Sequence, residues 1–302
     1  MPERNRNEFA ETQDTDFAYE VPELARFRVN VFRDQRGLGA VLRCIPSRIV
    51  PASELGIPQV VIDLCKMPKG LVLVTGPTGS GKSTTLAALI DHINSTTPGH
   101  IITIEDPVEF IHPNKRSLVN QREVGTHTGS FKKALRAALR EDPYVILVGE
   151  MRDLETIAIA VEMAVTGHLV FGTLHTSTAC GTVDRIIDQF PSDQQNQIRT
   201  MLADALIGVV SQMLCRKNGG GRAAAYEVMV VSTGVANLVR EGKTFQIPSL
   251  MQTGKALGMR LLNDCLADMV GNGTISADEA LSKAIDKETL RSRLRSRGLL
   301  AA

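Results

Sequence analysis

An apolar run followed by a glycine-rich loop constrains this chain more than any other feature. Leu71–Thr75 is a short aliphatic and β-branched segment, and the next eight residues, GPTGSGKS from Gly76 to Ser83, match the pattern G-x-x-x-x-G-K-[ST] in full. A helix-forming stretch follows at once. The loop therefore joins a predicted strand to a predicted helix, which is the context that confirms this motif and argues against a chance match.

Such a loop binds the phosphates of a nucleotide. Its glycines let successive backbone N–H groups turn toward an anion, and the dipole of the following helix adds favourable charge. Lys82 is expected to bridge the terminal phosphates, and the hydroxyl of Ser83 is expected to bind Mg²⁺. The predicted nucleotide-binding residues are Gly76, Pro77, Thr78, Gly79, Ser80, Gly81, Lys82, Ser83 and Thr84.

Short buried strands alternate with helices through the middle of the chain. Ile101–Ile104, Val145–Val148 and His168–Leu174 are apolar runs of strand length separated by helical stretches. This alternation predicts an α/β fold with a mostly parallel sheet covered on both faces. From about Asp193 onward the prediction is mainly helical, with a glycine-rich turn at 219–221.

The N-terminal fifty residues have a different character. Residues 1–20 are polar and are interpreted as a frayed terminus, whereas Arg26–Phe32 and Gly39–Ile45 alternate in polarity and predict a hairpin. A segment this short cannot bury a core by itself, so we interpret it as the end of a domain whose beginning is missing. Residues 46–58 resemble a linker.

Bulk composition limits the class of protein. The formal net charge is +1. A chain this close to neutral gives no global electrostatic argument for nucleic acid or an acidic membrane surface as a binding partner. An odd number of cysteines without metal-binding spacing argues against a disulfide framework or a zinc ribbon and suits a reducing cytoplasm. These are Cys44, Cys65, Cys180, Cys215 and Cys265. No signal peptide or apolar span is evident, which predicts a cytoplasmic location.

Acidic residues and a histidine follow three of the predicted strands. Glu150 closes a buried strand, the position of a carboxylate that faces the metal in P-loop NTPases. Glu105, Asp106 and Glu109 follow another strand, although solvated loop acids would give the same spacing. His175 ends a third strand, where it is either a sensor of the γ-phosphate or a structural residue.

Taken together, these segments resemble the superfamily of secretion and type IV pilus ATPases. That family has a Walker A loop, an acidic Asp box, a Walker B segment ending in Gly-Glu, and a His box. The matching segments occur here in the family's order, and the resemblance runs from about Ala25 to about Ala280. They are GPTGSGKST (76–84), TIEDPVEF (103–110), LVGEMRDLET (147–156) and GHLVFGTLHTSTA (167–179).

The resemblance implies a RecA-like P-loop core at 51–302, with C-terminal helices from about residue 193. It also implies a truncated α+β, PAS-like N-terminal domain at 1–50. Family members normally have about twice this much N-terminal domain. We therefore expect either a shortened piece or a short natural form, in which ATP binding survives while ring assembly is affected.

Within the superfamily the chain is most similar to the retraction ATPases. Supporting stretches are FKKALRAALREDP (131–143), DRIIDQFP (184–191) and VREGKTFQIPSLMQTG (239–254). Assembly and secretion members usually carry a tetracysteine zinc insert, but no C-x-x-C follows Cys215. The resemblance therefore implies a hexameric ATPase that powers type IV pilus retraction and twitching motility from the cytoplasmic side of the inner membrane. Its cofactors would be ATP and Mg²⁺ without zinc, and its partner the pilus platform protein, with no nucleic acid.

Residue roles also follow from the resemblance. Glu150 and Glu109 would position Mg²⁺ and the attacking water, and which of them is the general base is left open. His175 would be the His-box residue. Arg28 and Arg43 would reach the nucleotide from the N-terminal domain, the alternative being a solvated hairpin face; an arginine at the γ-phosphate is worth ~10³ to 10⁵ in rate.

Other functions are consistent with the nucleotide site alone. Within the class, the chain could power pilus assembly or type II secretion. Outside it, a DNA-acting RecA-like NTPase or a nucleotide-binding switch would use the same loop. A nucleic-acid motor is expected to present a basic, aromatic groove, and this chain is only 4% aromatic with no Trp. A small-molecule kinase is disfavoured because no acceptor-site signature is present.

Overall fold

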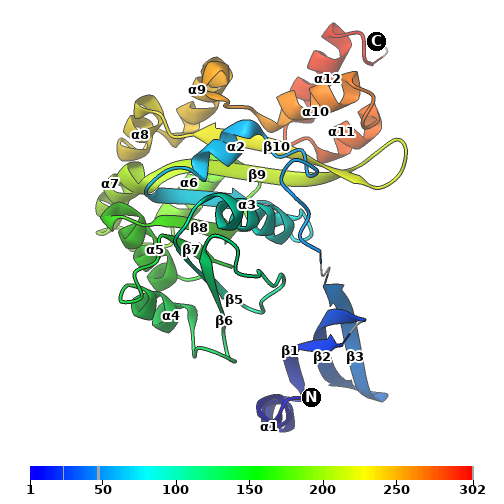
Figure 1. Ribbon diagram of the computed structural model, residues 1–302. Coiled ribbons are helices and arrows are strands. Elements are labelled where there is room, and N and C mark those ends of the chain that lie inside the picture. Colours follow the sequence, from blue (N-terminus) through cyan, green and yellow to red (C-terminus); the bar gives the residue numbers. More distant parts are fainter. Residues whose placement is uncertain (23, 46–47, 301–302) are drawn as a thin grey trace.

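The computed structural model describes residues 1–22, 24–45 and 48–300, which form a small N-terminal sheet, a large α/β core and a C-terminal group of helices (Figure 1). The small sheet lies at one end of the core and the last helices lie at the other. The predicted α/β class with a mostly parallel main sheet is confirmed.

The N-terminal part contains one helix and three antiparallel strands in the order β1-β2-β3. Its elements are α1 (Glu3–Thr12), β1 (Asp14–Val21), β2 (Ala25–Asp34) and β3 (Gly37–Ile45). The predicted hairpin is β2 and β3. The interpretation of residues 1–20 as a frayed terminus is wrong, because α1 and β1 occupy most of them.

A side-chain network explains why this polar segment is ordered. The amide of Asn5, which is buried, donates to Thr15 Oγ1 at 2.8 Å and to the backbone oxygen of Asp16 at 3.0 Å. α1 is thereby fixed to β1 by polar contacts, which hydrophobic periodicity does not reveal. β2 pairs with β3 from Arg26 to Asp34, with Arg28 opposite Arg43 and Asn30 opposite Val41.

The predicted linker joins this sheet to the core. Pro46 and Ser47 lie outside the described residues, and 48–58 form turns without a helix or strand. The short helix α2 (Gln59–Leu64) follows and packs on the main sheet. The predicted domain boundary near residue 50 stays a prediction.

The main sheet has seven strands in the order β10-β9-β4-β8-β7-β5-β6, of which only β10 runs antiparallel to its neighbour. Its central strands are buried along their whole length, which accounts for their uninterrupted apolar sequences. The strands are β4 (Gly70–Thr75), β5 (His100–Glu105), β6 (Leu118–Glu123), β7 (Val145–Val148), β8 (Leu169–Leu174), β9 (Leu206–Arg216) and β10 (Arg222–Val230).

Helices cover both faces of this sheet. One face packs against α2 and α3 (Lys82–Thr96), and the other packs against a larger apolar cluster of helices. That cluster draws on α4 (Phe131–Ala138), α5 (Leu154–Thr166), α6 (Ala179–Ile187), α7 (Gln195–Ala205), α8 (Thr233–Arg240) and α9 (Ile247–Thr253). Several of these helices begin at a polar capping residue. At the start of α5, for example, the side chain of Asp153 accepts a hydrogen bond from Thr156 N.

The prediction of a mainly helical chain from about Asp193 is wrong for 206–230. β9 and β10 extend the main sheet there and are joined by the glycine-rich turn at 219–221. β9 is buried for most of its length between β4 and β10, so its sequence shows no alternation that would separate a strand from a helix.

The predicted C-terminal helices are present. α10 (Leu262–Gly271), α11 (Ala277–Lys283) and α12 (Lys287–Ser296) form a separate apolar cluster against the ends of β9 and β10. No helix in the described part of the chain is long and apolar enough to cross a bilayer.

Candidate active site

Four adjacent strands place the predicted site residues along one edge of the main sheet. β4, β8, β7 and β5 are neighbours and parallel, so their carboxyl ends lie side by side. The phosphate loop follows β4, His175 follows β8, Glu150 follows β7, and the acidic segment follows β5. This edge is where ligands bind in open parallel α/β sheets.

The phosphate loop adopts backbone conformations that require glycine. Gly76 has φ 143° and Gly81, the cap of α3, has φ 91°. A Cβ at Gly76 would collide with the backbone oxygen of Gln212 and the Ser80 hydroxyl. The Gln212 amide donates to Ser80 O at 2.7 Å, so β9 supports the loop from behind.

Lys82 extends along the loop that precedes it. Its Nζ donates to the backbone oxygens of Gly76 at 2.8 Å and Pro77 at 3.2 Å, and lies 3.4 Å from His175 Nδ1. Burial lowers the pKa of Lys82, and the charges of Glu150 and Glu109 oppose this effect. The ammonium group therefore lies where anionic phosphates would meet it.

Glu150 is held by two cationic or proton-donating neighbours. Its Oε1 lies 3.0 Å from His175 Nε2, and its Oε2 accepts from Arg152 Nη2 at 2.6 Å. Partial burial alone would raise the pKa of Glu150, but the hydrogen bonds and charges of Arg152 and His175 outweigh burial and hold the pKa below its ordinary value. The carboxylate therefore stays ionised and able to accept hydrogen bonds.

The acidic segment after β5 contains carboxyls in different environments. Glu105 accepts from Thr103 Oγ1 at 2.6 Å, and burial raises its pKa. Burial also raises the pKa of Asp106, against the charges of Arg152 and Arg28. Glu109 faces the same cavity as Lys82 and Glu150. Glu105 is therefore not a solvated loop acid, the alternative that the sequence left open for this segment.

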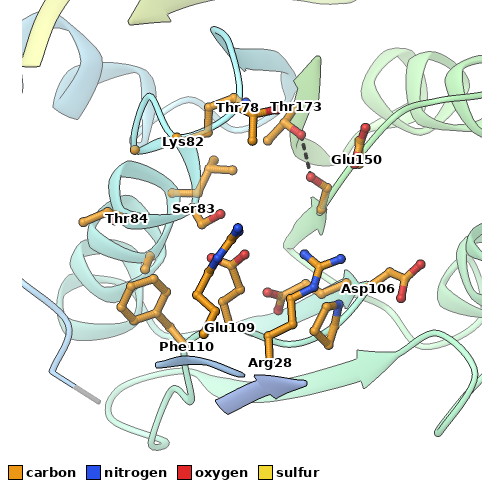
Figure 2. Close-up of a pocket in the computed structure, with 18 of the residues that line it drawn as sticks. Arg28, Thr78, Lys82, Ser83, Thr84, Asp106, Glu109, Phe110, Glu150 and Thr173 are labelled. Atoms are coloured by element: carbon orange, nitrogen blue, oxygen red, sulfur yellow. Dashed lines mark hydrogen bonds between the residues drawn. The ribbon is translucent and has the colours of Figure 1, made fainter. Parts of the chain in front are cut away.

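One cavity of about 770 Å³ brings the predicted residues together (Figure 2). Arg28 extends into it from below, toward Asp106 and Glu109, while Lys82 and Ser83 enter from the start of α3. Gly76, Pro77 and Ser80 do not line it and shape the loop instead. The predicted residues that line it are Thr78, Gly79, Gly81, Lys82, Ser83, Thr84, Glu109, Glu150, His175, Arg28 and Arg43.

Arg28 and Arg43 reach this cavity from the N-terminal sheet. They stand opposite each other on β2 and β3, so their side chains share one face of that sheet. Arg28 is half-buried and Arg43 is exposed. Their roles toward a nucleotide stay predictions.

Three further cavity residues with basic side chains were not predicted from sequence. Arg152 contacts Glu150 and lies two residues after it, within the segment LVGEMRDLET. Arg222 is the first residue of β10, and His112 lies buried beyond the acidic segment. No sequence motif marks Arg222 or His112.

Comparison with known proteins decides the family. The profile of the family described as "Type II/IV secretion system protein" matches residues 7–282. The chain belongs to this family. It is an ATPase of the type II/IV secretion system family.

Its relatives within the family include proteins of type IV pili. It is 54% identical over 284 residues to the Pseudomonas aeruginosa type IV pilus retraction ATPase PilT, covering 94% of this chain and 83% of that protein. It is 50% identical to a Neisseria gonorrhoeae twitching motility protein, covering 96% and 78%. A crystal structure of the retraction motor PilT with bound ADP superimposes with a TM-score of 0.90 at 49% identity, covering 97% and 83%.

The donors around the cavity fit Mg²⁺ bound together with a nucleotide. No cluster of three or more His, Cys, Asp or Glu side chains within the described ranges could hold a metal alone. Ser83 and the carboxylates of Glu109 and Glu150 nevertheless line the cavity. Mg²⁺ usually takes one or two protein ligands and completes its shell with phosphate oxygens and water, so this sparse set of oxygen donors suits it.

Proposed function

We propose that this chain is a pilus retraction ATPase, which hydrolyses ATP to drive twitching motility. The observation that carries the proposal is the convergence of the phosphate loop, two carboxylates, His175 and two arginines on one cavity, in a chain 54% identical to a retraction ATPase. The ADP in the related PilT structure supports a nucleotide as the ligand.

We assign each group a role in the reaction. The N–H groups of the loop and Lys82 would bind the phosphates. Ser83 and Glu150 would hold Mg²⁺, which would supply positive charge to stabilise the phosphates. Glu150 or Glu109 would orient the attacking water and accept its proton.

His175 and the arginines would act on the terminal phosphate. His175 contacts both Lys82 and Glu150, so it fixes their relative positions and can respond to the γ-phosphate. Arg28 and Arg43 would stabilise the charge that develops in the transition state, since both line the cavity from the N-terminal sheet. Closure of this sheet onto the core would thereby depend on the nucleotide state.

The motor would work as a homo-hexamer on the cytoplasmic side of the inner membrane. Sequential closure of the N-terminal sheet and the core around such a ring would displace the pilus platform protein on its axis. We expect ATP and Mg²⁺ as the cofactors, without zinc and without a nucleic-acid partner. The names of the relatives support the pilus, while the ring and its platform partner rest on the resemblance.

The test is Mg²⁺-dependent ATP hydrolysis by the whole chain beside Lys82→Ala and Glu150→Gln, with particle mass measured on the same samples. Turnover that both substitutions abolish at the lowest Mg²⁺ concentration that saturates the unsubstituted chain, from a six-subunit particle, supports the proposal. The control is Lys66→Ala, which removes an exposed ammonium two residues after α2 that pairs with Asp63. Unchanged turnover in Glu150→Gln contradicts the role given to that carboxylate, and salt-sensitive binding of DNA would favour a nucleic-acid motor instead.

A further inference from the structure

The carboxylate of Glu123 connects three segments that are distant in sequence. Its Oε2 accepts from the backbone N–H of Val108 at 3.1 Å and from Arg26 Nη2 at 3.3 Å, and its Oε1 accepts from Thr126 Oγ1 at 2.9 Å. The side chain is only 11% exposed. A buried carboxylate is stable only with such partners, because an unpaired one carries a large desolvation cost.

The first partner places Glu123 behind the acidic segment. Val108 precedes Glu109, the cavity-lining carboxylate, and follows Pro107, whose peptide bond with Asp106 is cis. The hydrogen bond to Val108 N therefore fixes the backbone next to Glu109. Glu123 itself ends β6, in register with Glu105 at the end of β5, so it acts from the adjacent strand.

The second partner belongs to the N-terminal sheet. Arg26 and Arg28 are two residues apart on β2, so their side chains leave the same face of the strand. Arg26 binds Glu123 of the core, while Arg28 enters the cavity. The ion pair thus holds the strand at the point from which Arg28 extends.

A further contact lies at the turn that follows Glu123. Gly125 has φ 85°, and a Cβ there would collide with the guanidinium group of Arg4, so the Arg4 side chain of α1 reaches this turn. Arg26 is 19% exposed in its ion pair, and a pair this sheltered is screened less by salt than a surface pair. The N-terminal part therefore docks on the core through the end of β6.

We infer that Glu123 is a positioning residue that couples the N-terminal sheet to the acidic segment, so that Arg28 and Glu109 reach the nucleotide together. When Arg26 is engaged, both groups are held at the cavity. When Arg26 leaves, Glu123 keeps its bonds to Val108 and Thr126, and the sheet can move while the acidic segment stays in place. This inference rests on the proposed ATPase function for its kinetic consequences, but the docking contact itself does not.

The kinetic test compares Arg26→Gln, Glu123→Gln and the double variant in the full chain. Each single variant is expected to lower kcat about tenfold and leave KM for ATP within about twofold, because a misplaced catalytic group can cost up to ~100-fold in rate. The double variant is expected to be no slower than either single one, and Arg26→Lys to recover most of the rate. If the loss of kcat in the double variant equals the product of the two single losses, the two residues act independently and the inferred coupling is overturned.

Glu141→Gln is the matched control. It also removes a carboxylate paired with an arginine of β6, Arg122 at 3.1 Å, but both partners of this pair belong to the α/β core. It is expected to leave kcat unchanged. Thermal unfolding of every variant identifies any loss of rate that comes from loss of fold. Arg26→Gln changes the less buried partner of the pair and leaves the hydrogen bonds of Glu123 with Val108 and Thr126 in place.

A distance measurement separates this inference from the proposed function. One spin label is attached to the native exposed Cys44 of β3 and the other to Ser192→Cys of the core, in a Cys180→Ser background. Pulsed electron paramagnetic resonance then measures the distance between the labels, which reports the position of the sheet. Without nucleotide, Arg26→Gln and Glu123→Gln are expected to broaden the distance distribution, and Glu141→Gln is not. An unchanged distribution in both overturns the inference, whereas a wild-type chain that hydrolyses no ATP contradicts only the proposed function.

Discussion

The imidazole of His175 lies between Lys82 and Glu150, with Nε2 3.0 Å from Glu150 Oε1 and Nδ1 3.4 Å from Lys82 Nζ. An ammonium group can only donate, so Nδ1 accepts and Nε2 carries the proton that is donated to Glu150. Lys82, which follows β4, and Glu150, which follows β7, are thereby joined through the ring of His175, which follows β8 between them. This connection gives the His-box residue a physical role before any nucleotide binds.

His175→Ala is expected to lower kcat by about 10- to 100-fold, because Lys82 and Glu150 lose the group that orients both. His175→Gln is expected to recover part of the rate, since an amide can also accept from Lys82 and donate to Glu150. Steady-state kinetics at saturating Mg²⁺ measure both variants. Equal rates for the alanine and glutamine variants would show that the two hydrogen bonds do not carry the effect.

Arg28→Ala and Arg43→Ala are each expected to lower kcat by up to ~10³-fold while nucleotide affinity changes by only a few fold, because in the proposed mechanism the arginines would act on transition-state charge. Fluorescent ADP titration and turnover measure the two quantities separately. Arg33→Ala is the control, since Arg33 is also on β2 but bonds to Gln13 away from the cavity. Equal losses in the control would point to the stability of the sheet as the cause.

Glu109→Gln and Glu150→Gln are expected to differ in their response to Mg²⁺. The variant that loses a metal ligand should regain turnover as Mg²⁺ is raised, because mass action restores the bound metal. The variant that loses the general base should stay slow, by ~10² to 10⁴-fold, at every Mg²⁺ concentration. We expect the first behaviour from Glu150→Gln. The opposite pattern would exchange the two roles.

The sequence predicts the site better than it predicts the ends of the fold. The phosphate loop, Glu150, Glu109 and His175 follow predicted strands, and parallel strands bring such residues to one edge. β9 was missed because its long apolar run is buried on both faces and carries no period of two. α1 was missed because its order comes from the side chain of Asn5, a polar contact without periodicity.

Residues that act through a neighbour are the hardest to predict. Glu123 ends a polar edge strand, LVNQRE, and its importance appears only when Arg26, 97 residues earlier in the chain, lies beside it. Arg152 is close to Glu150 in sequence, yet the pattern does not show that its guanidinium faces back toward the carboxylate. Both depend on tertiary placement, which spacing along one chain does not determine.

The burial of His112 predicts that the stability of this protein depends on pH. Its side chain is 7% exposed, its Nδ1 is buried without a hydrogen-bond partner in the described structure, and burial lowers its pKa to about 4. Asp91 opposes this lowering and Lys115 adds to it. The unfolded chain binds a proton on His112 near its ordinary pKa of 6.5, whereas the folded chain does not until about pH 4. The stability that neutral His112 provides is therefore complete above pH 6.5 and is lost as the pH falls toward 4.

His112→Phe is expected to flatten this dependence, because a phenyl ring fills the site and does not titrate. The wild-type chain should lose about 3 kcal/mol more of its unfolding free energy than the variant between pH 7 and pH 4, since one pKa unit corresponds to ~1.4 kcal/mol. Urea unfolding at a series of pH values measures the difference, and His92→Gln on α3 is the control. Parallel curves for wild type and His112→Phe would show that His112 is already protonated, or solvated, in the folded state, and that the carboxyls beside it cause the acid sensitivity instead.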